Sequence, residues 1–184
     1  MCKFFSSIVT RQGEILWHEA TDSHEDLVHH FKLKDNNLLG KFVRTEFYPD
    51  DVNDSGDVDK YKLRVDEEST PEWFKEIEEA TTEKLRAIVS RIIVKDDIEF
   101  ALGGVYVLAG KAKISVLKNG RVVMMWDSSQ VGKMLGSSQV GEMWDSSRVE
   151  TMWGSSRVET MWDSSQVETM SGSSQIRTDN RAKK

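Results

Sequence analysis

The chain has 184 residues, of which 38% are hydrophobic and 30% charged, and its formal net charge is −6. This length allows one ordinary domain or two small ones with a modest core. No apolar run reaches the roughly 18 residues of a membrane span, the start lacks a secretory signal, and the single cysteine, Cys2, excludes an intramolecular disulfide framework. These features predict a soluble cytoplasmic protein that does not contact the membrane.

The negative charge is concentrated in the first part of the chain. Residues 1–106 hold 14 basic and 23 acidic side chains, whereas residues 107–178 hold 8 and 7. Phosphate contacts need clustered Lys and Arg, so this distribution argues against nucleic-acid binding. We expect an acidic domain over 1–106, a repeat over 107–178 and a short basic tail over 179–184.

The first part predicts a small α+β layer. Strands are expected over 4–10, 14–18, 41–48 and 61–65, with a short helix capped by Ser23 and a longer helix from about residue 71 to residue 92. We expect this layer to cap the first coil of the repeat, because an uncovered solenoid end exposes backbone and core.

Cys2 directly follows the initiator Met and leads into the first expected strand. An N-terminal cysteine freed by removal of Met is the nucleophile of N-terminal-nucleophile amidohydrolases, and it needs a base such as its own amine or His24. The Cys-Lys-Phe start replaces the Cys-Gly-Ile start of the glutamine-amidotransferase type. An incidental thiol is the alternative interpretation.

An acidic loop lies between the third and fourth expected strands. Asp51, Asn53, Ser55, Asp57 and Asp59 match ligand positions of an EF-hand calcium loop, but Lys62 occupies the position of the bidentate Glu. The flanks also read as strands, so a solvated hairpin loop is the alternative to a metal site.

Four histidines, at positions 18, 24, 29 and 30, lie in the same part of the chain. Adjacent histidines on a helix point about 100° apart. We therefore expect surface histidines that form no common ligand set.

The last part of the chain is a nonapeptide repeat. From Met125 it reads MWDSSQVGK, MLGSSQVGE, MWDSSRVET, MWGSSRVET, MWDSSQVET, MSGSSQIRT, and degenerate units begin at Val116 and Val107. The third position alternates between Asp and Gly, which a nine-residue structural unit does not explain. An 18-residue coil of two different halves does, so we predict a parallel β-solenoid of about four coils, with Val and Met inside.

Two columns of side chains on this solenoid are candidate sites. Trp126, Trp144 and Trp162 fall in one half of the coil and Trp153 in the other; these four side chains either form an exposed strip for a partner or pack at the corners. Carboxylates at positions 127, 145 and 163 either cap the amides of the following serines or hold an ion.

The repeat resembles known families of short-repeat solenoids. Calcium-binding β-rolls share the nine-residue unit, but their turns read Gly-Gly-x-Gly-x-Asp, so calcium binding is not implied; pentapeptide-repeat proteins have a period of five. The units GSSQVGEM (136–143) and DSSQVETM (163–170) are similar to tandem units of phage and bacterial proteins that carry a small α+β domain in front. This resemblance implies the architecture and hardly any function. For a phage-encoded chain, the expected location is the host cytoplasm or the virion.

We interpret the chain as a non-enzymatic binding or structural module without a cofactor. Its repeat would face a protein partner or another copy of the chain, and the last coil, near 171–178, has no obvious cap. The alternatives are a hydrolase that uses Cys2 and, from the resemblance alone, a phage inhibitor of a host defence enzyme or its signal.

Overall fold

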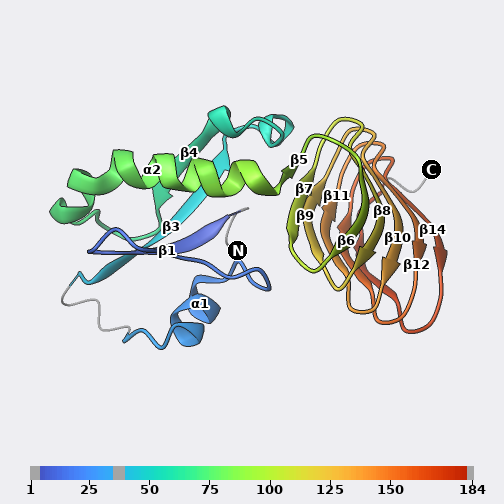
Figure 1. Cartoon of the computed structure of the whole chain (residues 1–184), viewed down its shortest axis with the longest axis horizontal. Helices are drawn as coiled ribbons and strands as arrows, with labels where there is room; N and C mark the ends of the chain where they lie inside the picture. The colour runs from blue at the N-terminus through green and yellow to red at the C-terminus, as the bar shows by residue number, and fades with distance from the viewer. Residues whose placement is uncertain (1–4, 35–39, 182–184) are drawn as a thin grey trace. The chain divides into compact units, whose positions relative to one another are not determined.

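The computed structural model describes residues 5–34 and 40–181, and the chain divides into two compact units, Met1–Arg91 and Ile92–Lys184. Among the described residues, the first unit contains an antiparallel sheet and the α-helices α1 and α2, and the second is a parallel β-solenoid (Figure 1). The predicted α+β domain followed by a solenoid is confirmed. No helix within the described ranges is long and apolar enough to cross a membrane.

The first unit is built on a four-stranded sheet in the order β2-β1-β3-β4. Its elements are β1 (Ser6–Thr10), β2 (Ile15–Leu16), α1 (His24–His30), β3 (Phe42–Pro49), η2 (Val52–Asp54), η3 (Val58–Lys60), β4 (Tyr61–Val65) and α2 (Glu72–Ile92). The expected elements are all present. The antiparallel pairing of β1 with β3, which brings Ile8 opposite Arg44, joins the two hairpins into one sheet.

The two helices cover opposite faces of this sheet. Ile8 packs in a cluster with Leu27 of α1, whereas its neighbour Val9 packs with Phe74 of α2. Successive strand residues point to opposite faces, so the two clusters form separate layers. Ser23 caps α1 as predicted, because its hydroxyl accepts the Asp26 amide at 3.3 Å.

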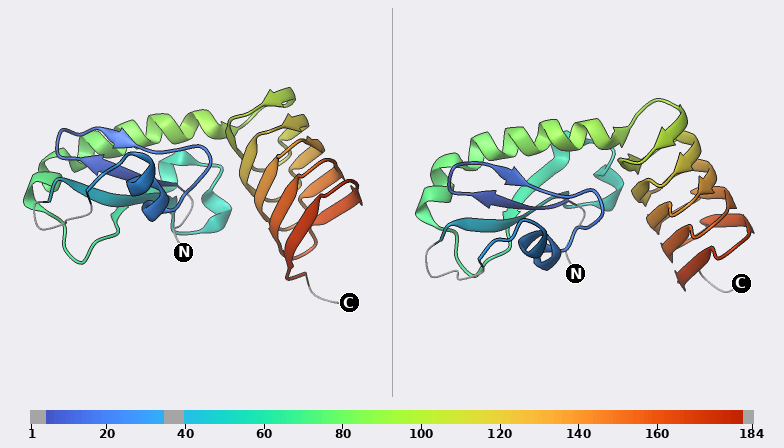
Figure 2. Two further views of the ribbon diagram at one scale, coloured as in Figure 1. Left: turned by 90° about the horizontal axis from the view of Figure 1, so that it is seen from below. Right: turned by 60° about the horizontal axis from the view of Figure 1, so that its bottom comes forward.

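The solenoid consists of two parallel sheets, in the orders β14-β12-β10-β8-β6 and β15-β13-β11-β9-β7-β5. Its strands are β5 (Ile93–Val94), β6 (Ile98–Leu102), β7 (Val105–Leu108), β8 (Lys113–Lys118), β9 (Arg121–Met125), β10 (Gln130–Leu135), β11 (Gln139–Met143), β12 (Arg148–Met152), β13 (Arg157–Met161), β14 (Gln166–Met170) and β15 (Gln175–Asp179). Each coil gives one strand to each sheet, and the coils stack in chain order (Figure 2).

The strand register confirms the 18-residue coil. Val131 pairs with Val149, and Val140 with Val158, so equivalent residues are 18 positions apart. The inward position of Val and Met is confirmed as well. The fully buried Val and Met residues of this ladder are Val122, Met125, Val131, Met134, Val140, Met143, Val149, Met152, Val158 and Met161.

The solenoid begins earlier than the repeat frame predicts. β5 and β6 form a coil before Val107, which raises the number of coils from about four to about five. This coil has no Met-Trp or Ser-Ser signature, so the nonapeptide pattern does not reveal it.

The frame of the degenerate units is also corrected by one residue. Leu108 and Leu117, rather than Val107 and Val116, occupy the Met position, opposite Met125 and Met134. Their frame differs because the Asn119-Gly120 corner is one residue shorter than the Gly-Ser-Ser corner of the later units.

The glycines at the Gly corner of the later coils are closely stacked. Both corners use a left-handed residue at the third position, with φ +53° at Asp145 and +70° at Gly154. A Cβ on Gly154 would lie 3.0 Å from the carbonyl oxygen of Gly136 in the coil before it, which is too close for an unstrained contact. In the later coils the backbone of the preceding glycine therefore leaves little room for a Cβ at the Gly corner, whereas Asn119 holds the same position in an earlier coil.

Candidate functional site

The tryptophans of the repeat divide into covered and exposed side chains. Trp126 is only 2% exposed, and Trp144 and Trp162 are half-buried and stacked on one another. The indole nitrogen of Trp144 donates to a carboxylate oxygen of Glu142 at 3.0 Å. These three tryptophans thus follow the corner-packing alternative and form no continuous exposed strip.

Trp153 is the exposed member of the set, at 54%. It follows β12, in the five-stranded sheet. The other exposed large apolar side chains of the described residues, Phe100, Leu102 and Met170, lie on β6 and β14 of the same sheet. The most exposed large apolar side chains of the solenoid therefore lie on strands of the five-stranded sheet or directly after one of them.

The Asp column caps backbone amides across coils. A carboxylate oxygen of Asp145 accepts the amide of Asp127 at 3.3 Å, and one of Asp163 accepts the amide of Asp145 at 3.4 Å. Each carboxylate thus binds the coil before its own, and not the following serine amides as expected. The amide hydrogen bonds place a partial positive charge beside each carboxylate, which offsets repulsion along the column.

The last coil leaves part of the Val and Met ladder uncovered. Met170 is 41% exposed, and Val167 and Ile176 are only partly buried. In β15 the Met position is taken by Asp179, which lies opposite Met161. The guanidinium of Arg181 donates to both carboxylate oxygens of Asp179, at 2.8 and 2.5 Å. The last strand of the six-stranded sheet therefore carries an ion pair at this position.

Two carboxylates of the acidic loop accept amides within its own turns, and that of Asp59 lies 3.5 Å from Arg86 of α2. The Asp51 carboxylate accepts the amide of Asn53 at 2.9 Å, and that of Asp57 accepts the amide of Asp59 at 3.1 Å. The Tyr61 hydroxyl donates to the carbonyl of the buried Ser55 at 2.7 Å. These bonds are those of an anchored hairpin loop between β3 and β4.

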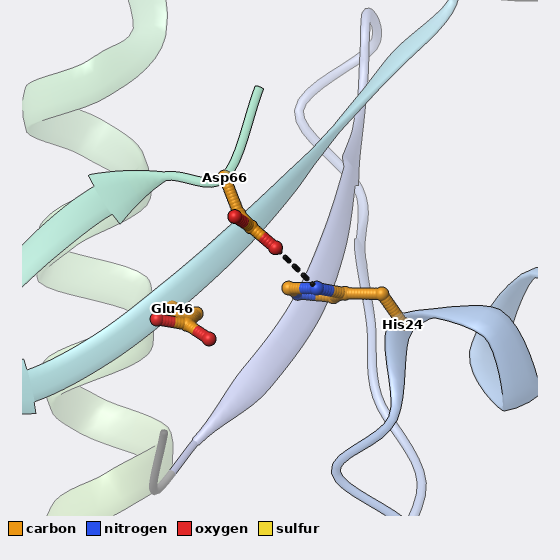
Figure 3. Close-up of side chains that lie close together, drawn as sticks. All are labelled: His24, Glu46 and Asp66. Carbon is orange, nitrogen blue, oxygen red and sulfur yellow. Dashed lines mark hydrogen bonds and ion pairs between the residues drawn. The ribbon is translucent and has the colours of Figure 1, made fainter. Parts of the chain in front are cut away.

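His24 was expected at the surface, but it is only 5% exposed. Its Nδ1 lies 3.1 Å from a carboxylate oxygen of Asp66, and its Nε2 lies 3.0 Å from the carbonyl oxygen of Thr45. Figure 3 shows the Glu46 carboxylate beside this pair. In the part of the chain that the structure describes, His24, Glu46 and Asp66 are the group of His, Cys, Asp or Glu that could hold a metal ion.

This arrangement bears on the hydrolase alternative. Cys2 lies outside the described residues, so its distance to His24 is not defined. Both ring nitrogens of His24 lie within hydrogen-bond distance of oxygen atoms, those of Asp66 and Thr45.

Glu46 and Asp66 were not singled out from the sequence. They meet because β3 and β4 pair with Thr45 opposite Val65, which places Asp66 one residue beyond the pairing and close to Glu46. The proximity of His24, Glu46 and Asp66 could be predicted only from the register of this hairpin.

Comparison of the chain with family models, with curated proteins and with solved structures gives no significant match.

Proposed function

We propose that the chain is a non-enzymatic binding module that pairs with a second copy of itself through the last coil of its solenoid. The observation that carries this proposal is a change in burial along one column. Met134 and Met152 are fully buried, whereas Met170, the last member, is 41% exposed. A coil of a second copy would cover Met170 as each coil covers the one before it.

The backbone of β14 supports the same pairing. β14 is the last strand of its sheet and has a paired neighbour, β12, on one side. The outer edge of such a strand presents amide and carbonyl groups that can pair with another chain. About a two-fold axis normal to the sheet, β14 of one copy meets β14 of the other in antiparallel orientation.

The side chains of β14 suit this orientation. On the inner side, Val167 of one copy would face Met170 of the other, so two apolar side chains meet. On the outer side, Glu168 forms an ion pair with Arg148 of its own chain, which compensates its charge. The contact centres on β14 because Asp179 and Arg181 make the neighbouring end of the six-stranded sheet polar.

Sedimentation velocity of the full chain over a range of concentrations tests the proposal. We expect a dimer that dissociates on dilution, and Met170→Asp should weaken it at least tenfold, because the carboxylate would be buried without a partner. Leu102→Asp is the matched control, since Leu102 is exposed on β6 at the opposite end of the same sheet. A monomer at every concentration, or a dimer lost in Leu102→Asp and kept in Met170→Asp, would contradict the proposal.

A further inference from the structure

The first unit carries a group of side chains that the proposed function does not use. His24 Nδ1 and Asp66 Oδ2 are 3.1 Å apart, and ligand atoms of His24, Glu46 and Asp66 all lie within 4.8 Å of one another. Zinc bonds to nitrogen and oxygen are about 2.0–2.2 Å long, so neighbouring ligand atoms of a tetrahedral site are about 3.3 Å apart. The His24 and Asp66 atoms already have nearly this separation.

The second nitrogen of His24 is placed as in a metal-binding histidine. Nε2 lies 3.0 Å from the Thr45 carbonyl oxygen, which can only accept, so Nε2 carries the proton and donates. A neutral ring protonated at Nε2 offers its lone pair at Nδ1, toward Asp66. Histidines that bind metals usually donate their other ring N–H to a carbonyl or carboxylate in this way, which fixes the ring and its tautomer.

From this geometry we infer that His24, Glu46 and Asp66 bind a divalent metal ion of the zinc type. One nitrogen and two carboxylate oxygens are ligands that zinc accepts, and water would complete a tetrahedral set. The rigid part of the site is His24, which is 5% exposed, while Asp66 is 57% exposed and gives the ion access from solvent. The Glu46 carboxylate lies within 4.8 Å of the other two ligand atoms.

The competing account is a plain ion pair. With both nitrogens of His24 facing acceptor oxygens, the ring would carry two protons and a positive charge, and Asp66 would neutralise it. The two accounts differ in the proton at Nδ1, which a bound metal ion displaces, and therefore in whether the chain takes up metal at all.

Calorimetric titration of the metal-stripped full chain with zinc chloride separates the two accounts. We expect binding of one ion per chain, weakened at least tenfold by His24→Gln and by Asp66→Asn. Asp66→Asn is the safer variant for folding, since it preserves the shape of an exposed side chain. Cobalt(II) in place of zinc should give the visible absorption of a tetrahedral site in the unaltered chain and not in Asp66→Asn.

Two controls guard against binding elsewhere. The His18 and His30 rings lie 4.3 Å apart and could take up zinc adventitiously, so His30→Gln should leave the affinity unchanged. Asp57→Asn tests the acidic loop in the same way. No uptake of zinc, or uptake that Asp66→Asn leaves intact while His30→Gln or Asp57→Asn abolishes it, would overturn the inference. Neither result bears on self-association through β14.

Discussion

Trp144 stacks on Trp162 with ring centroids 4.8 Å apart and an angle of 12° between the ring planes. Paired strands are about 4.8 Å apart, so the two indoles repeat at the spacing of the coils. Trp144 and Trp162 therefore contribute to the packing of the solenoid. The uncovered last coil is the better candidate for contact with a partner.

Replacing Trp144 tests the structural role of this stack. Trp144→Ala removes a half-buried indole and the stacking contact that it makes with Trp162. It should lower the free energy of unfolding by about 2 kcal/mol. Urea denaturation measures the loss. Trp153→Ala removes an exposed indole and should change stability by less than about 0.5 kcal/mol. Equal losses in the two variants would show that the Trp144 stack has no special weight.

Exchanging Gly and Asp at the two corners of the coil should lower stability by different amounts. Gly154→Asp places a Cβ 3.0 Å from the Gly136 carbonyl oxygen, at a φ of +70°, and should cost about 2 kcal/mol or more. Asp145→Gly removes the acceptor for the Asp127 amide, but it also removes the strain of a non-glycine residue in the left-handed region. The loss in the free energy of unfolding should therefore stay under about 1 kcal/mol. Thermal unfolding of both variants checks this order, and a reversed order would contradict the close packing at the Gly corner.

Asp179 is predicted to limit pairing at the end of the solenoid. Asp179→Met would continue the Met column beyond Met161 with an apolar side chain and so enlarge the uncovered apolar end. We expect this variant to associate more strongly than the unaltered chain in sedimentation experiments. Unchanged or weaker association would show that the charged end does not oppose contact between copies.

Tyr61 should give the stability a dependence on alkaline pH. Burial raises the pKa of the Tyr61 hydroxyl above its ordinary value of 10.0, so the folded chain holds this proton more tightly than the unfolded chain. The contribution is therefore complete below about pH 10 and declines as the pH rises further. Tyr61→Phe, which also loses the bond to the Ser55 carbonyl, should be less stable at neutral pH by about 1 kcal/mol and should decline less steeply above pH 10.

Denaturation with urea at pH 7, 10 and 11 measures this difference. Tyr48→Phe is the control for the general effect of alkali, because Tyr48 is a half-buried tyrosine of the neighbouring strand. Parallel declines for the unaltered chain and Tyr61→Phe would contradict the prediction.

The sequence predicts those parts of the fold that local repetition determines. The positions of Val149 and Met152 recur every 18 residues, and the alternation at the third position indicates two kinds of corner. The first coil, which contains Phe100, has no such recurrence. Its residues are recognised as part of the solenoid only from the pairing of β6 with β8.

The group around His24 could not be predicted for a related reason. His24, Glu46 and Asp66 come from a helix start, a strand and the residue after another strand. Their approach depends on the register of β3 against β4, and no spacing along the chain encodes that register. The burial of Trp126 likewise depends on bending of the chain at a corner, which simple alternation along a strand does not describe.

Hydrogen exchange of the full chain at low and high protein concentration tests self-association through the last coil most directly. We predict that amides of β14, residues 166–170, become more protected at high concentration, while amides of β12, already paired on both sides, do not change. Protection of β14 that is independent of concentration, or a change confined to another part of the chain, would contradict the account.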